Sequence, residues 1–186
     1  MKTIILVVAL FSLNIQANME ELATYIDEAR VLVETREYLK TVKDDLATGG
    51  RLDRQTLSSF ENKLERIAIR GCDCENNEKI IRAQAYAMIG TINGVISKET
   101  RSISHGKKSY QDLEKARELD PRNVDAIRGQ GEALKAILSQ GFFSRNIVSM
   151  TLGLDLRKEQ RKLIRDLKTF TEHKHLLRLA EQLARL

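Results

Sequence analysis

Residues 109–138 read SYQDLEKARELDPRNVDAIRGQGEALKAIL and contain the one proline of the chain, Pro121. A proline cannot continue a helix, and it disfavours helical geometry in the residue before it. Upstream of Pro121, apolar residues recur at intervals of three and predict one helical face: Tyr110, Leu113, Ala116 and Leu119. Downstream, Asn123 is the predicted N-cap of a second helix. The stretch therefore predicts two helices that meet at a short turn and pack against each other.

The glycines inside predicted helices include Gly90, upstream of this stretch, and Gly131 within it. A glycine in a helix interior costs roughly 1 kcal/mol relative to alanine. The usual reason to accept that cost is the close approach of a neighbouring helix. We therefore expect both glycines to lie at helix–helix contacts.

The junction resembles the tetratricopeptide repeat, whose pattern includes an alanine and a closing proline in the second helix and a glycine in the first. Leu113, Ala116 and Pro121 match the second helix of such a repeat. Two further segments match first helices, and they are centred on Tyr86-x2-Ile89-Gly90 and Ile127-x2-Gln130-Gly131-x2-Leu134. The resemblance covers residues 79–139.

The chain departs from the repeat pattern in its spacing and at two polar positions. Gly90 and Ser109 are 19 residues apart, whereas a 34-residue repeat places them about 12 apart. We assign the additional residues to the turn and predict a polar loop over residues 98–108. Asn93 and Gln130 replace apolar residues of the pattern.

The resemblance implies an all-α fold in which antiparallel hairpins stack as a short right-handed solenoid of about seven helices. It also implies a concave groove lined by the first helix of each pair, with Arg82, Tyr86, Arg128 and Lys135 as candidate groove residues. The expected function is non-catalytic binding of a protein or peptide partner. The alternative is a small-ligand-binding or transporter-accessory protein with an interior cleft.

Composition agrees with a helical domain. Apolar residues make up 42% of the 186 residues, which does not indicate disorder, and the net charge is a modest +5. We expect a single domain over residues 18–186, with residues 155–186 forming capping helices at the end of the array.

Residues 1–17 are typical of a cleavable signal peptide: Lys2 precedes an apolar run that is too short to span a bilayer comfortably, and Ala17 lies before the expected cut. The alternative is an uncleaved N-terminal anchor. The chain contains no Asn-x-Ser/Thr site. These features favour a periplasmic or secreted protein, bacterial rather than eukaryotic.

Further helices are predicted on both sides of the repeat-like segment. Residues 20–46 form the first, with Arg36 interrupting an apolar stripe of Leu22, Ile26, Ala29, Val33, Leu39, Val42 and Leu46. Asp53 and Asp155 are predicted N-caps, and Thr171 is the expected start of the last helix. Residues 141–150 are expected to form a loop or a short helix in which Phe142 and Phe143 cover the core.

Few residues suggest chemistry. Cys72 and Cys74 are the only cysteines, and in an oxidising compartment each is the expected disulfide partner of the other. Thiol-redox catalysis is the less favoured alternative, and a metal site lacks further ligands nearby. The three histidines are expected to face solvent, and no catalytic motif or phosphate-binding loop occurs. The sequence predicts no cofactor, no metal and no enzyme activity.

The C-terminal segment carries most of the excess positive charge. From Asp155 onward there are nine Lys or Arg and five Asp or Glu, and the candidate basic face consists of Arg157, Arg161, Arg165 and Lys168. Such a face suits an anionic membrane surface or an acidic partner. Because aromatic residues are not interleaved with it, nucleic acid is not expected. The simplest interpretation is the solvated outer face of a capping helix.

Overall fold

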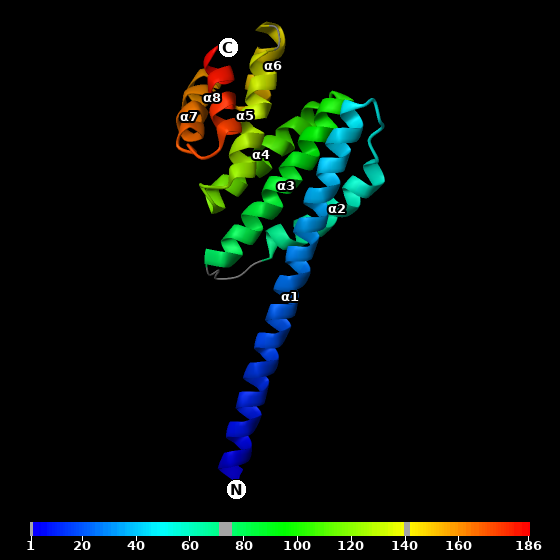
Figure 1. Ribbon diagram of the computed structural model, residues 1–186, viewed down its shortest axis with the longest axis vertical. Helices are drawn as coiled ribbons and strands as arrows, with labels where there is room; N and C mark the ends of the chain where they lie inside the picture. Colours follow the sequence, from blue (N-terminus) through cyan, green and yellow to red (C-terminus); the bar gives the residue numbers. More distant parts are fainter. Residues whose placement is uncertain (1, 71–75, 140–141) are drawn as a thin grey trace.

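The computed structural model describes residues 2–70, 76–139 and 142–186, with side chains from residue 23 onward except at positions 76, 77, 142–144, 148 and 152. These residues form an all-α fold without strands (Figure 1). The helices are α1 (Lys2–Ala47), α2 (Arg54–Ile69), α3 (Asn76–Thr100), α4 (Ile103–Leu119), α5 (Val124–Leu138), α6 (Phe142–Leu152), α7 (Leu156–Lys168) and α8 (Lys174–Ala184).

The N-caps predicted at Asp53, Asn123 and Asp155 are confirmed, but the last helix begins at Lys174 and not at Thr171, because residues 170–173 form a turn. The carboxylate of Asp53 accepts hydrogen bonds from the first turn of α2, and that of Asp155 does the same for α7. Asn123 Oδ1 accepts from Ala126 N at 2.9 Å at the start of α5. α4 ends one residue before Asp120, whose backbone is extended as expected for a residue that precedes proline.

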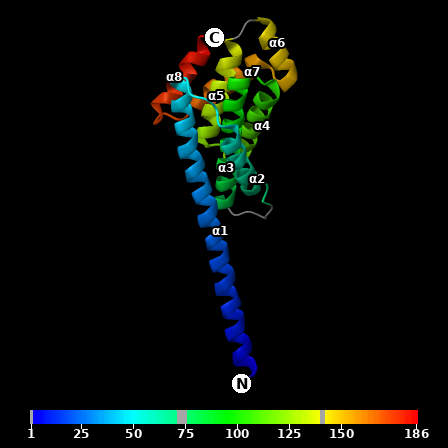
Figure 2. The same cartoon turned by 90° about the vertical axis from the view of Figure 1, so that its right-hand side faces the viewer.

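Successive odd-numbered helices contact one another, α1 with α3, α3 with α5, and α5 with α7. The even-numbered helices α2, α4 and α8 each pack against the helix with which they form a hairpin. Among these pairs, α3 and α4 run side by side in both views (Figures 1 and 2). The α7–α8 hairpin lies at the end of the molecule farthest from the N-terminus (Figure 1).

Gly90 and Gly131 both lie at helix–helix contacts, as predicted. A Cβ at Gly90 would lie 2.7 Å from Leu113 Cγ and 3.0 Å from the backbone oxygen of Ser109, both on α4. A Cβ at Gly131 would lie 2.7 Å from Leu179 Cδ2 on α8. A side chain at Gly90 would press on the backbone of α4, whereas one at Gly131 would displace the end of the Leu179 side chain.

The core has two main clusters with a smaller one between them. The first joins α1, α2 and α3 and centres on Leu57, Leu64 and Ile92. The second joins α5, α7 and α8 and consists of Ile127, Leu134, Leu138, Leu163, Leu167, Leu176, Leu179, Ala180 and Leu183. The small cluster of Ala87, Leu113, Ala116 and Ala126 lies where α3, α4 and α5 meet. Small side chains there allow the three backbones to approach closely.

The apolar stripe predicted for the first helix is wrong in its first half. Ile26 and Val33 are 59% and 57% exposed, and Ala29 is exposed as well. The buried face instead includes Thr35, whose hydroxyl donates to the carbonyl oxygen of Val31 at 2.7 Å. The first half of α1 has apolar residues on two faces of the helix. Only the face that continues to Leu39 and Val42 packs against α2 and α3.

The predicted loop over residues 98–108 is also wrong. α3 continues to Thr100 and α4 begins at Ile103, so only a tight turn separates them. The residues that exceed the repeat spacing lengthen the two helices. Because residues 142–152 form a helix of their own, the described part of the chain has eight helices, one more than expected.

α1 is continuous from Lys2 to Ala47, and its N-terminal part projects well beyond the other helices (Figure 1). The predicted signal segment therefore runs without a break into the predicted first helix. Its cleavage remains a prediction. Within the described residues, no helix combines the length and the apolar character needed to cross a membrane.

Candidate functional site

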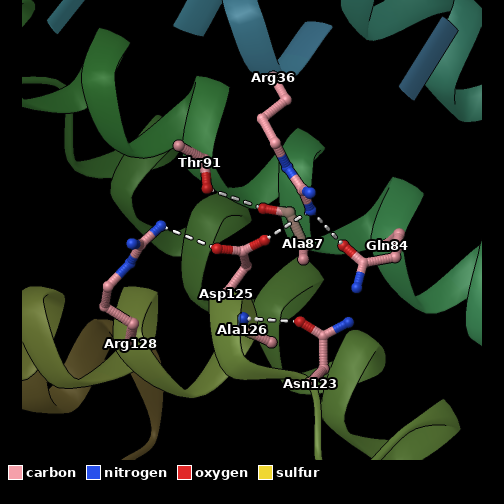
Figure 3. A network of polar contacts seen from close by, with 8 residues as sticks. All are labelled: Arg36, Gln84, Ala87, Thr91, Asn123, Asp125, Ala126 and Arg128. Atoms are coloured by element: carbon pink, nitrogen blue, oxygen red, sulfur yellow. Dashed lines mark hydrogen bonds and ion pairs between the residues drawn. The ribbon is translucent and has the colours of Figure 1, made fainter. Parts of the chain in front are cut away.

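The first helices of three hairpins meet in a network of exposed polar side chains. We call Arg36 of α1, Gln84 of α3, and Asp125 and Arg128 of α5 the polar strip (Figure 3). Arg36 Nη2 donates to Gln84 Oε1 at 3.2 Å and to Asp125 Oδ2 at 3.0 Å. Arg128 Nη2 donates to the other oxygen of Asp125 at 2.8 Å. One arginine thus connects α1 with both α3 and α5.

Local structure positions each of these groups. Thr35 and Leu39 face the core, which directs Arg36 away from it. Asp125 lies in the first turn of α5, where the helix N-terminus favours a carboxylate. On the adjacent part of α3, Ala87 has a small side chain. The hydroxyl of Thr91 donates to the carbonyl oxygen of Ala87 at 2.9 Å, within the same helix (Figure 3).

Positive charge predominates around the polar strip. Lys43 lies two helical turns after Arg36 on α1, and none of the described ion pairs includes it. Loss of hydration and the positive charge of Arg128 lower the pKa of Lys43, although Asp125 and Glu132 partly offset this. The ammonium group therefore lies close to α5, in a region that has more cationic than anionic side chains.

The four candidate groove residues divide into two pairs with different neighbours. Arg128 belongs to the polar strip, and Lys135 on the same helix lies 3.6 Å from Glu132. Arg82 Nε instead donates to the carbonyl oxygen of Ala68 at 3.0 Å, at the end of α2.

Tyr86, one turn after Arg82, lies beneath the ammonium group of Lys115 on α4, at 5.4 Å from the ring centroid. Arg82 and Tyr86 thus contact α2 and α4, whereas Arg128 and Lys135 pair with acidic residues of their own helix, α5.

Sequence reasoning missed Arg36 as a member of the site. Its position inside an apolar stripe suggested a side chain extending outward from a buried face, but Arg36 is exposed because the buried face lies elsewhere on α1. The polar neighbours Thr35 and Gln84, both at helical positions close to core residues, were the available signals.

A second polar cluster lies between α2, α3 and α4. Lys108 forms ion pairs with Glu61 and with Glu65, the latter at 3.0 Å, and Asn93 donates to Glu61 at 2.9 Å. Burial lowers the pKa of Lys108, but its hydrogen bonds to the two glutamates outweigh this and raise the pKa overall. Asn93 stands where the repeat pattern has an apolar residue, and its amide has Glu61 as its polar partner.

Asp112 lies beside this cluster and is 6% exposed. Its Oδ2 has no hydrogen-bond partner. Burial raises the pKa of Asp112, and the charges of Glu61 and Glu65 act in the same direction against those of Lys108 and Lys115. The ionised carboxylate is therefore an unfavourable feature of the folded chain.

Arg117 joins α4 to two later helices, α5 and α7. Its guanidinium donates to Gln130 at 2.7 Å and forms an ion pair with Asp166, and its side chain is only 14% exposed. The polar residue Gln130 at an apolar repeat position was the signal for this contact, since a buried amide requires a partner.

The histidines do not form a metal site. His105 lies within α4 rather than in a loop, and its Nδ1 is 2.8 Å from the Ser102 hydroxyl. His173 precedes α8, and its ring centroid is 5.7 Å from that of His175. Half-burial of His105 and His173 also differs from the predicted solvent-facing positions. No group of three metal-ligating side chains occurs among the described residues.

Other sequence predictions fall outside what the structure describes. Cys72 and Cys74 lie in the segment 71–75, so the predicted disulfide remains a prediction. The backbone of Phe142 and Phe143 belongs to α6, but their side chains are not among those described.

The predicted basic face lies on α7, where Arg157, Arg161, Arg165 and Lys168 are all exposed. None of these four side chains forms an ion pair with a described residue. An open depression of about 420 Å³ adjoins α7 at the α6–α7 turn. This depression lies at the surface and differs from the interior cleft that the small-ligand alternative requires.

Comparisons with known proteins do not identify the chain: no family model, no curated protein and no solved structure matches it. The resemblance to tetratricopeptide proteins therefore remains a prediction that depends on the residues quoted above.

Proposed function

We propose that this chain is a non-catalytic interaction or scaffold protein of the cell envelope, periplasmic or secreted, that binds a protein or peptide partner. The binding surface is the groove side of the odd-numbered helices, with the polar strip at its centre. In this proposal the hairpins form a short right-handed solenoid of the tetratricopeptide type. The resemblance of residues 79–139 to that repeat and the consecutive contacts of α1, α3, α5 and α7 support it.

The observation that carries the proposal is the contact from Arg36 to Asp125, between residues 89 positions apart in the sequence. It brings the first and third hairpins to one surface. The side chains of Arg36 and Asp125 are 61% and 28% exposed. Exposed ion pairs contribute only about 0–1 kcal/mol to stability, so a partner that offers its own polar groups can replace this pair at low cost.

The test is affinity capture of envelope proteins with the chain and with a double variant, Arg36→Glu with Arg128→Glu. Reversal of both charges leaves three carboxylates at the strip and removes both donors to Asp125. We expect the retained partner to be lost. The matched control is Arg51→Glu with Lys79→Glu, which reverses two exposed charges away from the strip.

Retention of the same partner by both variants would contradict the proposal. Equal loss from both would show that net charge, and not this surface, governs binding. Circular dichroism of each variant establishes that the helices remain folded, which is expected because all four substituted side chains are wholly or partly exposed.

A further inference from the structure

The two acidic side chains of α7 each have a neighbour on α4, whereas its basic side chains are exposed. Of its two acidic residues, Asp166 is paired with Arg117 of α4, and Glu159 lies near Tyr110 of the same helix, with a side chain only 14% exposed. Burial, followed by the charge of Glu159, raises the pKa of Tyr110. Both carboxylates of α7 therefore have a neighbour on α4, and only Glu159 also lies within ion-pair distance of a base on the outer side of the helix.

The outer side of α7 carries six exposed cationic side chains: Arg157, Lys158, Arg161, Lys162, Arg165 and Lys168. Only Lys162 has an acidic neighbour among the described residues, Glu159 at 4.0 Å. Salt bridges with the protein itself would be expected if these residues served only to stabilise the fold. We call these six residues the α7 basic face.

The depression at the α6–α7 turn adjoins three of them, Lys158, Lys162 and Arg165. Its other walls include Gly153, whose φ of 67° makes the turn, and Asp155. The Asp155 carboxylate already accepts from two backbone N–H groups of α7. Glu159, at 4.0 Å from Lys162, also lines the depression, so three bases and two carboxylates surround a hollow that can admit a side chain and whose net charge is positive.

We propose that the α7 basic face and this depression bind an acidic segment of a polypeptide. Residues 157–168 span about 16 Å along the helix axis, which an extended peptide of about five residues covers. One carboxylate side chain of the segment enters the depression between Lys158, Lys162 and Arg165. The adjoining acidic residues of the segment lie along the other three basic residues of α7.

Two features of the described residues favour a polypeptide over other anions. None of the large exposed apolar side chains lies on α7, whereas a helix that inserts into a membrane interface exposes such residues. No aromatic residue occurs between Leu156 and Lys168 on which the bases of a single-stranded nucleic acid would stack. The surface lies on other helices than the polar strip, so it stands independently of the function proposed above.

The test measures binding of a fluorescein-labelled decaglutamate peptide to the full chain by fluorescence anisotropy. We expect saturable binding that weakens as salt is added, because charge pairing drives it. The triple variant Lys158→Glu, Lys162→Glu, Arg165→Glu should bind at least about tenfold more weakly. A triple variant with the same change in net charge, Arg51→Glu, Lys79→Glu, Lys107→Glu, should bind within about threefold of the unaltered chain.

Titration of the unaltered, isotope-labelled chain with the same peptide provides a test that needs no variant. Amide shifts should concentrate in residues 153–168. Three results would overturn the proposal: equal weakening of peptide binding in both triple variants, amide shifts spread over the whole surface, or no binding of the peptide. So would tighter, α7-dependent binding of phosphatidylserine vesicles or of single-stranded RNA than of the peptide, since the partner would then belong to another class.

Discussion

Substitution of Gly90 by alanine tests the central packing contact of the fold. The new Cβ would lie 2.7 Å from Leu113 Cγ and 3.0 Å from the carbonyl oxygen of Ser109. Carbon atoms in good contact are about 3.5–4.0 Å apart, so α4 must move by about 1 Å or Leu113 must change its conformation. The movement would also disturb the buried hydrogen bond of 2.6 Å from Ser109 Oγ to the Gly90 carbonyl oxygen.

The expected magnitude is the balance of two effects. Alanine gains roughly 1 kcal/mol over glycine in a helix interior. Overpacking costs about 1–3 kcal/mol, and a weakened buried hydrogen bond adds about 1 kcal/mol. We expect a net destabilisation of about 1–3 kcal/mol, which lowers the melting temperature by roughly 3–10 °C in a chain of this size.

Urea unfolding followed by far-ultraviolet circular dichroism measures this change. Gly94→Ala is the comparison variant, because a Cβ there meets only Ser109 Oγ closely, at 3.1 Å. Displacement of that hydroxyl weakens its hydrogen bond to Gly90, but the cost of about 1 kcal/mol is offset by the gain of roughly 1 kcal/mol from alanine in a helix, and no overpacking is added. Gly94→Ala should therefore leave stability unchanged or raise it slightly. If Gly90→Ala proves as stable as Gly94→Ala, the close approach of α3 and α4 is not as described.

Three other substitutions probe buried polar groups. Asp112→Asn should stabilise the chain by about 1 kcal/mol at pH 7. Because the pKa of Asp112 is raised in the folded chain, its ionised form destabilises the fold fully at neutral pH. This destabilisation decreases as the pH falls through the raised pKa. The stability advantage of Asp112→Asn should therefore vanish near pH 4. Arg117→Met should cost about 3 kcal/mol in urea unfolding, since Gln130 and Asp166 lose their partner; a cost below 1 kcal/mol would refute this. Asn123→Ala should cost about 1 kcal/mol through loss of the α5 cap, while Asn123→Ser should not.

Features set by neighbouring residues could be predicted from the sequence. The caps at Asp53, Asn123 and Asp155 and the helix end before Pro121 depend on local geometry alone. The glycine contacts could be predicted as well, because glycine in a helix is unfavourable without a packing reason.

Features that depend on a partner far along the chain could not be predicted in the same way. The first part of α1 offers two apolar faces at helical spacing, and only contact with α2 and α3 selects between them. The polar residues 98–108 favoured a loop, but α3 and α4 satisfy their backbone hydrogen bonds as helices, and small residues bring the two together.

The candidate site shows the same division. Arg128 and Lys135 were selected from the repeat pattern, and each pairs with an acidic residue three positions earlier on α5. The pairing of Arg36 with Asp125 joins residues 89 positions apart and has no local signature. Arg82 and Tyr86 follow the pattern but contact α2 and α4.

The contact of Arg117 with both Gln130 and Asp166 restricts how the sequence can diverge. A lysine keeps the charge but lacks the planar fork that reaches two acceptors at once. Loss of Arg117 leaves the buried amide of Gln130 without this partner, and loss of Gln130 or Asp166 leaves the largely buried guanidinium with one acceptor fewer. Chains that inherit this architecture should therefore retain all three residues or exchange them as a set, and aligned orthologues would reveal the linkage as correlated substitution.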